Sequence, residues 1–173
     1  AVVYAPAADT QRHMQQAGSN VSIAAINGPG HCVISGEKHA VQEMQAVLAD
    51  ARIRTRALEV SHAFHSAMME PMLDAFRDIA DSVTFQIPRI RFISSKTGQS
   101  AGRELLSAQY WVSQISDAVR FADAVQALSQ QKFSAFLEIG PGSTLIRLAQ
   151  QNLSVNEDLR FFASLEATHP DET

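Results

Sequence analysis

Short apolar runs divide the first third of the chain into recognisable elements. Ala1–Tyr4 is a short apolar run, and Ala7–Ala17 has the weakly amphipathic spacing of a helix. Two further apolar runs, Val21–Ile26 and Cys32–Ser35, flank Asn27-Gly28-Pro29-Gly30, which is typical of a hairpin turn. We therefore predict a strand, a helix and a β-hairpin in this order.

A helix with one apolar stripe follows the hairpin. Between Glu37 and Arg52, four apolar residues recur at helical spacing: Val41, Met44, Val47 and Leu48. Thr55–Val60 then has the composition of a strand. The resulting order, β-α-β-β-α-β, is that of a ferredoxin-like arrangement, so we predict an α+β subdomain over residues 1–60.

The remainder, residues 61–173, alternates helices and strands. One helix is marked by Met69, Met72, Leu73, Phe76, Ile79 and Val83, and a second by Ala118, Phe121, Ala122, Val125 and Leu128. Pro71 requires the first of these helices to start irregularly or to begin near that residue. Strands are predicted at Ile90–Ser94, Ala135–Ile139 and Arg160–Ser164, with a helix that begins near Thr144.

This alternation predicts an α/β layer with buried parallel strands, so the fold class of the whole chain is α/β. A sheet of so few strands is too small to bury both of its faces. Residues 61–173 therefore indicate part of a larger layer, and we expect the chain to be a piece of a longer protein. The absence of a methionine before Ala1, which opens directly in a strand-like run, agrees with this expectation.

Charge and composition exclude several classes of protein. The net charge of −4 argues against a general nucleic-acid binder, which would have a basic surface. Cys32 is the single cysteine, so an internal disulfide and a cysteine-rich zinc cluster are both excluded. No apolar run approaches the roughly 20 residues that span a bilayer, and the first residues do not resemble a signal peptide. We expect a cytoplasmic protein that binds neither nucleic acid nor membrane.

Candidate chemistry is concentrated in Val60-Ser61-His62-Ala63-Phe64-His65-Ser66, where a predicted strand gives way to a helix. A histidine at a strand end can serve as a general base because its pKa lies near neutral pH. The alternative is that both histidines are ordinary loop residues and that Ser66 caps the next helix. A metal site formed by His62, His65 and Glu70 is a third possibility, but no second ligand cluster completes it.

Two other features each allow two interpretations. The loop Ile139-Gly140-Pro141-Gly142-Ser143 joins a strand to a helix and is either an anion-binding helix start or a plain tight turn. It lacks the lysine of a P-loop and the third glycine of a dinucleotide-binding loop. The alternating Arg52, Arg54 and Arg56 are either a solvated edge or a docking patch for an acidic protein.

Several motifs together resemble the acyltransferase domains of modular polyketide synthases, which are related to malonyl-CoA:acyl carrier protein transacylases. The resemblance runs from about Ala1 to Leu165. Its landmarks, in chain order, are Ile26-Asn27-Gly28-Pro29, Val33-Ile34-Ser35-Gly36, His62-Ala63-Phe64-His65-Ser66, Tyr110-Trp111-Val112, Val119-Arg120-Phe121 and Leu137-Glu138-Ile139-Gly140-Pro141-Gly142. Each motif alone is weak, but all of them in this order are highly specific.

The resemblance implies an activity and a set of partners. In this family a serine takes an acyl group from coenzyme A and passes it to the phosphopantetheine thiol of an acyl carrier protein. No cofactor or metal is implied, because the coenzyme A thioester is the substrate and the phosphopantetheine belongs to the carrier protein. The neighbouring domains of a polyketide synthase are further expected partners.

The resemblance also assigns roles to particular residues. His65 matches the histidine that accepts the serine proton and returns it to the departing thiol. A backbone carbonyl near the position matching Gln114 is expected to fix the tautomer of that histidine. Phe64 and His62 are expected in the acyl-donor pocket, and Asn27 is also assigned to substrate binding. The block His62-Ala63-Phe64-His65 resembles the malonyl-selecting version, because Phe64 would crowd the α-methyl of methylmalonyl.

The chain departs from the family at one important point. The nucleophile motif Gly-His-Ser-x-Gly is absent from the sequence. Ser66 is no substitute, because it follows the base on the same turn and lacks the strand-to-helix elbow of a nucleophile. In the family, the serine, the arginine that pairs with the malonyl carboxylate and the oxyanion-hole donors all precede the region that this chain matches. A smaller departure is Ala67, where polyketide domains often have proline.

The resemblance therefore implies a ferredoxin-like subdomain over residues 1–60, followed over residues 61–173 by the C-terminal part of an α/β-hydrolase-like core. We expect this chain alone to be inactive, because it lacks the nucleophilic serine. The alternative is a non-catalytic module that keeps the ferredoxin-like subdomain for docking a carrier protein.

Overall fold

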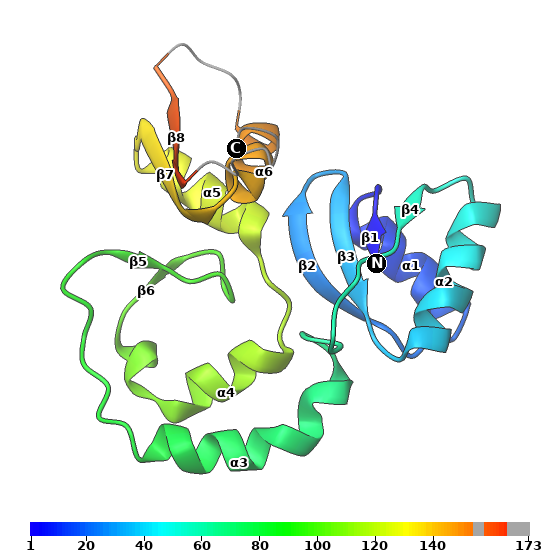
Figure 1. The fold of residues 1–173 in the computed structure, drawn as a ribbon, viewed down its shortest axis with the longest axis horizontal. Helices are drawn as coiled ribbons and strands as arrows, with labels where there is room; N and C mark the ends of the chain where they lie inside the picture. Colours follow the sequence, from blue (N-terminus) through cyan, green and yellow to red (C-terminus); the bar gives the residue numbers. More distant parts are fainter. Residues whose placement is uncertain (154–157, 166–173) are drawn as a thin grey trace, which may run out of the picture.

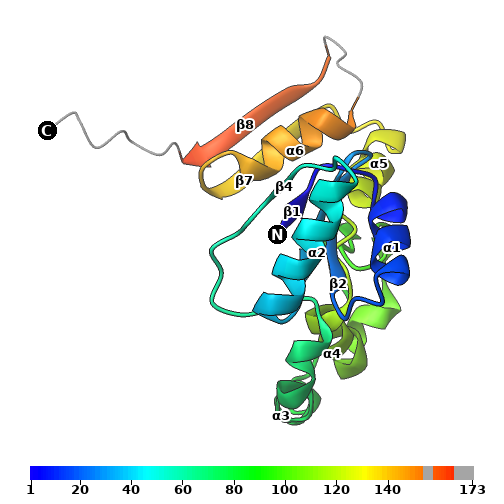
Figure 2. The ribbon, with the colours of Figure 1, turned by 90° about the vertical axis from the view of Figure 1, so that its right-hand side faces the viewer.

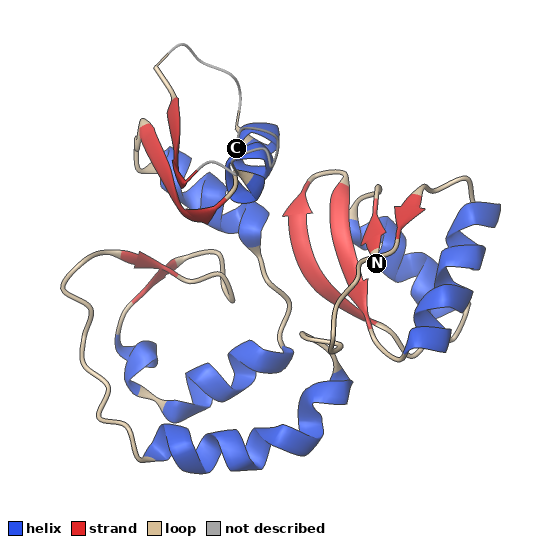
Figure 3. Cartoon of the chain, viewed as in Figure 1, coloured by secondary structure: helices blue, strands red, loops and turns tan. Residues whose placement is uncertain are grey.

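The computed structural model describes residues 1–153 and 158–165. Figures 1 and 3 show three groups of elements: a small sheet with two helices, a pair of adjacent helices with a short hairpin, and a two-stranded sheet with two more helices. None of the helices in these residues is both long and apolar enough to cross a bilayer.

The small sheet contains the predicted order of elements. These are β1 (Val2–Val3), α1 (Ala7–Gln16), β2 (Ser22–Gly28), β3 (His31–Ser35), α2 (Lys38–Asp50) and β4 (Thr55–Arg56). The strands lie side by side in the order β2-β3-β1-β4, and each neighbouring pair is antiparallel. The hairpin predicted around Asn27-Gly28-Pro29-Gly30 joins β2 to β3, which confirms the turn.

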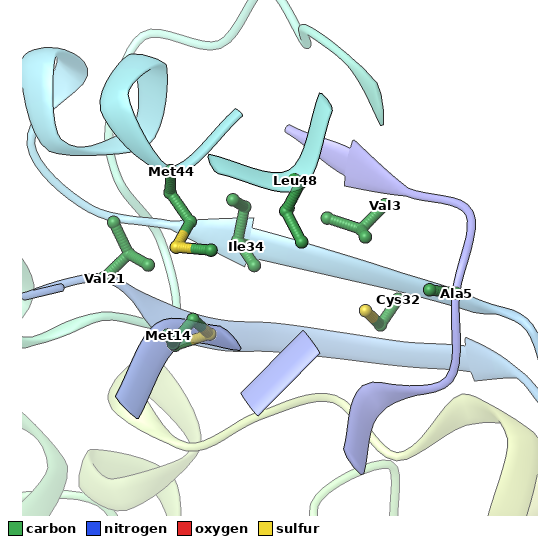
Figure 4. Packing of buried hydrophobic residues seen from close by; sticks show 8 residues of the cluster. All are labelled: Val3, Ala5, Met14, Val21, Cys32, Ile34, Met44 and Leu48. Carbon is green, nitrogen blue, oxygen red and sulfur yellow. The ribbon is translucent and has the colours of Figure 1, made fainter. Parts of the chain in front are cut away.

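One hydrophobic core holds α1 and α2 against this sheet. Figure 4 shows its buried members, which are Val3, Ala5, Met14, Val21, Cys32, Ile34, Met44 and Leu48. The two α2 residues, Met44 and Leu48, belong to the stripe predicted from helical spacing. Burying a side chain such as Leu48 contributes about 1.5–3 kcal/mol to folding, so this stripe is what attaches α2 to the sheet. Figure 1 shows α1 and α2 on the same side of β2 and β3, the side that faces the viewer in Figure 2.

The last strand of this group is shorter than predicted. A strand was expected over Thr55–Val60, but β4 contains only Thr55 and Arg56. Residues 57–60 are exposed coil that leads toward His65. Leu58 and Val60 are both exposed, so the apolar composition that suggested a strand does not reflect burial in a sheet.

Two helices and a hairpin follow. The helical segment predicted around Pro71 is η1 (Ala67–Met69), a 3-10 turn, followed by α3 (Glu70–Asp81), so its irregular start is confirmed. The strand predicted at Ile90–Ser94 was wrong in length and in pairing. The observed β5 (Phe92–Ile93) pairs antiparallel with β6 (Ser100–Ala101) and does not join the parallel strands. Ile90 is 84% exposed.

The region after β6 contains elements that the sequence pattern missed. They are η2 (Arg103–Leu106) and α4 (Ala108–Ser116), and α4 packs along α3 (Figure 1). The helix predicted from Ala118 begins later, as α5 (Phe121–Gln130). Between α4 and α5, Val119 pairs in parallel with Ala25 of β2, and its backbone N–H donates to the Ala24 carbonyl. This short connection ties the second part of the chain to the edge of the small sheet.

The two-stranded sheet of the last group of elements is covered on one face and exposed on the other. Strand β7 (Ala135–Pro141) pairs parallel with β8 (Arg160–Leu165), and α6 (Thr144–Asn152) lies between them in sequence. One face packs on α5 and α6 through Val125, Ala149, Leu153, Phe121, Phe136, Leu159 and Phe161. The opposite face carries Leu137, Ile139 and Phe162, and Ile139 is 85% exposed. Parallel sheets are normally buried on both faces, so the exposed face of this sheet is typical of one part of a larger α/β layer.

Candidate active site

His65 adopts an unusual backbone conformation. Its φ is +57°, in the left-handed region that residues other than glycine enter at a cost of about 1–3 kcal/mol. Its backbone N–H donates to the Ile115 carbonyl at 3.1 Å, at the end of α4. This hydrogen bond links residues that are far apart in sequence and helps to hold His65 in the strained conformation.

The imidazole of His65 makes a second hydrogen bond to the same region. Its Nδ1 lies 2.8 Å from the backbone oxygen of Asp117. A carbonyl oxygen can only accept a hydrogen bond, so Nδ1 must carry the hydrogen. In the neutral ring Nε2 then has the lone pair and can accept a proton. The ring is partly buried, and its tautomer is fixed without a carboxylate.

The sequence placed this carbonyl near Gln114, and the carbonyl found at the ring belongs to Asp117. Gln114 lies inside α4, and its side-chain amide donates to Ser95 Oγ at 3.4 Å. Asp117 lies just past the end of α4 with an extended backbone, φ −73° and ψ 149°. Because the carbonyls of a helix interior point along its axis toward later N–H groups, a residue beyond the helix end is better able to meet the ring.

Ser66 caps the turn that follows His65. Its hydroxyl donates to the Ala63 carbonyl at 2.6 Å and accepts from the Met68 N–H at 3.3 Å. The residue is only 3% exposed. Its proton and one lone pair are therefore engaged within the loop, as the capping interpretation predicted.

His62 and Phe64 lie beside a cleft that His65 also lines. The two rings are tilted against each other, with centroids 5.7 Å apart, and Phe64 is 51% exposed. His62 Nδ1 is 2.9 Å from the hydroxyl of Ser61. The cleft has a volume of roughly 960 Å³, and its walls come from β2, β3, α2 and the coil after β4.

Asn27, the third residue assigned to substrate binding, lies elsewhere. It is near the end of β2, and its backbone carbonyl accepts a hydrogen bond of 2.6 Å from the Asn152 side chain on α6. The residues that line the cleft do not include it. The structure thus brings together His62, Phe64 and His65, and it gives Asn27 a contact between β2 and α6.

A metal site is not assembled in the part of the chain that the structure describes. No three His, Cys, Asp or Glu side chains in residues 1–153 and 158–165 come together as a possible ligand group. Glu70, suggested as a third ligand beside His62 and His65, is an exposed residue at the start of α3.

An acidic residue of β7 caps the helix that follows the glycine-rich loop. The Glu138 carboxylate accepts a hydrogen bond of 3.0 Å from the Ile146 N–H in the first turn of α6. Gly140 and Gly142 have φ values of +155° and +112°, which favour glycine. Because Glu138 already occupies the N-terminal end of α6, the arrangement favours the tight-turn interpretation over an external anion site.

Arg56 lies in β4, the edge strand of the small sheet, and Arg52 and Arg54 lie in the segment just before it. The guanidinium of Arg54 is 3.9 Å from the ring centroid of Tyr4, which stacks on His31. Burial, followed by the positive charge of Arg56, lowers the pKa of His31. All three arginines are exposed, which agrees with a solvated edge, and docking of an acidic protein here stays a prediction.

Comparisons with known proteins agree with this fold. The family model described as "Acyl transferase domain" matches residues 3–173. Polyketide synthase GfsA of Streptomyces halstedii is 46% identical over 140 residues, which cover 81% of this chain and 2% of that protein. The chain belongs to the acyltransferase-domain family found in modular polyketide synthases.

Two solved structures give the corresponding likeness in three dimensions. The acyltransferase domain from the second module of the salinomycin polyketide synthase has a TM-score of 0.91 and 39% identity, covering 98% of this chain and 39% of that chain. A malonyl-transacylase in complex with its type II polyketide synthase acyl-carrier protein has a TM-score of 0.83 and 26% identity, covering 96% of this chain and 54% of that chain. The chain therefore covers only part of the domain.

We predict that the Glu138 cap stabilises the fold. Replacing Glu138 by Ala removes the acceptor for the Ile146 N–H and should lower the free energy of unfolding by about 0.5–2 kcal/mol in urea denaturation. The exposed Glu59 serves as the control, and Glu59→Ala should have little effect. Inorganic phosphate should leave the melting temperature of the unmodified chain unchanged. A phosphate-dependent rise in that temperature, or equal destabilisation by the two variants, would contradict this account of the loop.

Proposed function

We propose that this chain is the C-terminal part of an acyltransferase domain that moves a malonyl unit from coenzyme A to the phosphopantetheine thiol of an acyl carrier protein. His65 is the general base, and the nucleophilic serine comes from a segment that precedes this chain. The observation that carries the proposal is the hydrogen bond between His65 Nδ1 and the Asp117 carbonyl, because it leaves Nε2 as the proton acceptor of a residue that lines the cleft.

Each half of the transfer moves one proton through the imidazole. As the serine oxygen attacks the thioester carbonyl, the serine proton passes to Nε2, and the departing coenzyme A thiolate then takes that proton. In the second half, the carrier thiol gives its proton to Nε2 as its sulfur attacks the acyl-serine. The serine oxygen leaves and recovers the proton. A neutral imidazole is suited to both roles because its unprotonated nitrogen can accept a proton and then return it.

A backbone carbonyl suits this dyad better than a carboxylate in one respect. The carbonyl of Asp117 fixes the ring and its tautomer, yet it adds no full negative charge next to Nδ1. The fixed left-handed backbone of His65 supplies the second constraint on the ring. Together these contacts limit the directions in which Nε2 can point, which is the geometric requirement for general base catalysis.

Phe64 and His62 form one wall of the proposed acyl-donor pocket. Phe64 lines the cleft and is 51% exposed, so it is available to meet an extender unit. A bulky ring disfavours the extra α-methyl of methylmalonyl, and one methyl group changes discrimination by about 1–3 kcal/mol. The pocket is therefore malonyl-selective in this proposal.

The proposed architecture has two subdomains. Residues 1–60 form the ferredoxin-like subdomain, in keeping with the strand order β2-β3-β1-β4. Residues from 61 onward form the C-terminal part of a hydrolase-like core, in keeping with the half-exposed parallel strands β7 and β8. The partners in this proposal are malonyl-CoA, an acyl carrier protein and neighbouring polyketide synthase domains, and the setting is cytoplasmic.

We predict that the chain alone is not acylated. After incubation with malonyl-CoA, its intact mass should remain unchanged, because the chain supplies the base without the nucleophile. The complete domain, in which the upstream segment precedes this chain, should gain one malonyl group. A stable adduct on the chain alone that disappears when one of its own serines is replaced would overturn the division of roles. If the complete domain also stays unmodified, the enzyme proposal is rejected in favour of a non-catalytic docking module.

We also predict that Phe64→Ser relaxes extender selection. In the complete domain, with malonyl-CoA and methylmalonyl-CoA in competition, the malonyl preference should fall by about tenfold or more, because space for the methyl group is created. Phe133→Ser is the matched control, since Phe133 is also partly exposed but does not line the cleft. An unchanged product ratio for Phe64→Ser would show that this ring does not border the acyl pocket.

A further inference from the structure

We propose that Lys96 is a positioning residue for His65, acting through Asp117. The role of Lys96 is to hold the residue whose carbonyl orients the imidazole. This inference rests on the proposed function of His65 as the base, and it goes further by naming a residue that lies outside the cleft.

Lys96 is directed at the C-terminal half of α4. Its Nζ donates to Ser113 Oγ at 2.5 Å and pairs with Asp117 Oδ2 at 3.1 Å. The same ammonium lies 5.6 Å from the ring centroid of Tyr110. The Lys96 side chain is only 25% exposed, so the ion pair is less screened than a typical surface pair.

The turn that carries Lys96 is itself well anchored. The Lys96 N–H donates to Ser94 Oγ at 3.1 Å, and Ser94 is fully buried and hydrogen-bonded to the Tyr110 hydroxyl. Gly98 lies so close to α5 that an added Cβ would fall 2.3 Å from the Asp123 side chain. The ammonium of Lys96 is therefore presented from a fixed backbone, which lets it restrain a neighbour.

Asp117 needs such a restraint because it lies beyond the end of α4. Its backbone N–H still donates to the Ser113 carbonyl at 2.9 Å, but its extended ψ takes its own carbonyl out of the helix. Helix ends fray, and the Asp117 side chain is half-exposed. By binding both Asp117 and Ser113, Lys96 fixes the two residues that set the direction of the carbonyl at His65.

The chain of contacts is therefore continuous from the β5–β6 turn to the base. Lys96 binds the Asp117 carboxylate, and the Asp117 carbonyl binds His65 Nδ1. If the ion pair is lost, the carbonyl gains freedom to rotate, and the ring loses its preference for the hydrogen on Nδ1. An imidazole with the hydrogen on Nε2 presents a donor to the serine and cannot take its proton.

The test is the tautomer of His65, measured by nitrogen NMR on this chain with labelled histidine. The ring signals of His65 are identified by their loss in His65→Gln. The unmodified chain should show the Nδ1–H form. In Lys96→Met the signals should shift toward a mixture with the Nε2–H form, while Lys96→Arg, which keeps the charge, should restore the original spectrum. Lys132→Met is the control, since Lys132 follows α5 and takes part in none of these contacts.

Asp117→Asn provides an independent variant, because it removes the charge pair and keeps the backbone carbonyl. It should produce the same spectral shift as Lys96→Met, with unfolding curves showing that both variants remain folded. If both folded variants keep the original tautomer, the inference is overturned. In the complete domain, Lys96→Met should lower kcat by up to about 100-fold with little change in the KM for malonyl-CoA.

These readouts separate the two proposals. Suppose that the tautomer shifts in Lys96→Met but acylation of the complete domain does not require His65. This result would support the positioning role of Lys96 and reject the proposal that His65 is the general base. If the tautomer is unchanged in Lys96→Met and acylation of the complete domain does require His65, the proposal for His65 is supported and the positioning role of Lys96 is rejected.

Discussion

The short segment from Ile115 to Val119 is the constraint on which the site depends. Its first carbonyl accepts the backbone N–H of His65, and the Asp117 carbonyl meets the imidazole. Two residues later, Val119 exchanges hydrogen bonds with the edge of β2, since Ile26 N–H also donates to the Val119 carbonyl at 2.7 Å. The last turn of α4 and the short connection after it thus fix the base and attach it to the small sheet. These hydrogen bonds therefore fix the position of His65 relative to β2, which forms one wall of the cleft.

The strain in His65 is consistent with this arrangement. A left-handed backbone outside glycine persists only where surrounding contacts over-determine it. Here the contacts are the two carbonyls at the end of α4 and the capped turn at Ser66. The buried core between α2 and the sheet contributes the rigid wall on the other side of the cleft. The geometry of the site therefore depends on packing far from His65 as well as on the direct hydrogen-bond partners of this residue.

The elements that the sequence predicted well are those with a strong local signal. The Asn27-Gly28-Pro29-Gly30 turn and the α2 stripe both depend on neighbouring residues, and both are present. Helix α4 was missed because its buried residues, Ala108, Tyr110 and Val112, recur at every second position, which is the spacing of a strand. Strand β4 was overextended because apolar residues after Arg56 are exposed in the cleft wall.

The sequence singled out three residues that line the cleft, His62, Phe64 and His65, but not the contacts that they make. The block from His62 to His65 can be identified from the motif, and the structure places its aromatic residues beside the cleft. Asp117 could not be identified in this way, because its carbonyl meets a ring 52 positions earlier in the chain. Local patterns do not encode such a contact, and only the end of α4 determines which carbonyl points at His65. The same reason explains why Lys96 has no sequence signature.

The most direct measurement is the single-turnover rate at which the complete domain is acylated by malonyl-CoA when His65 is replaced by Ala. General base catalysis contributes about 10²–10⁴-fold, so the rate should fall by that factor. The exposed His39 on α2, replaced in the same way, should leave the rate unchanged. A folded His65→Ala domain that loads its malonyl group at the original rate would contradict the account.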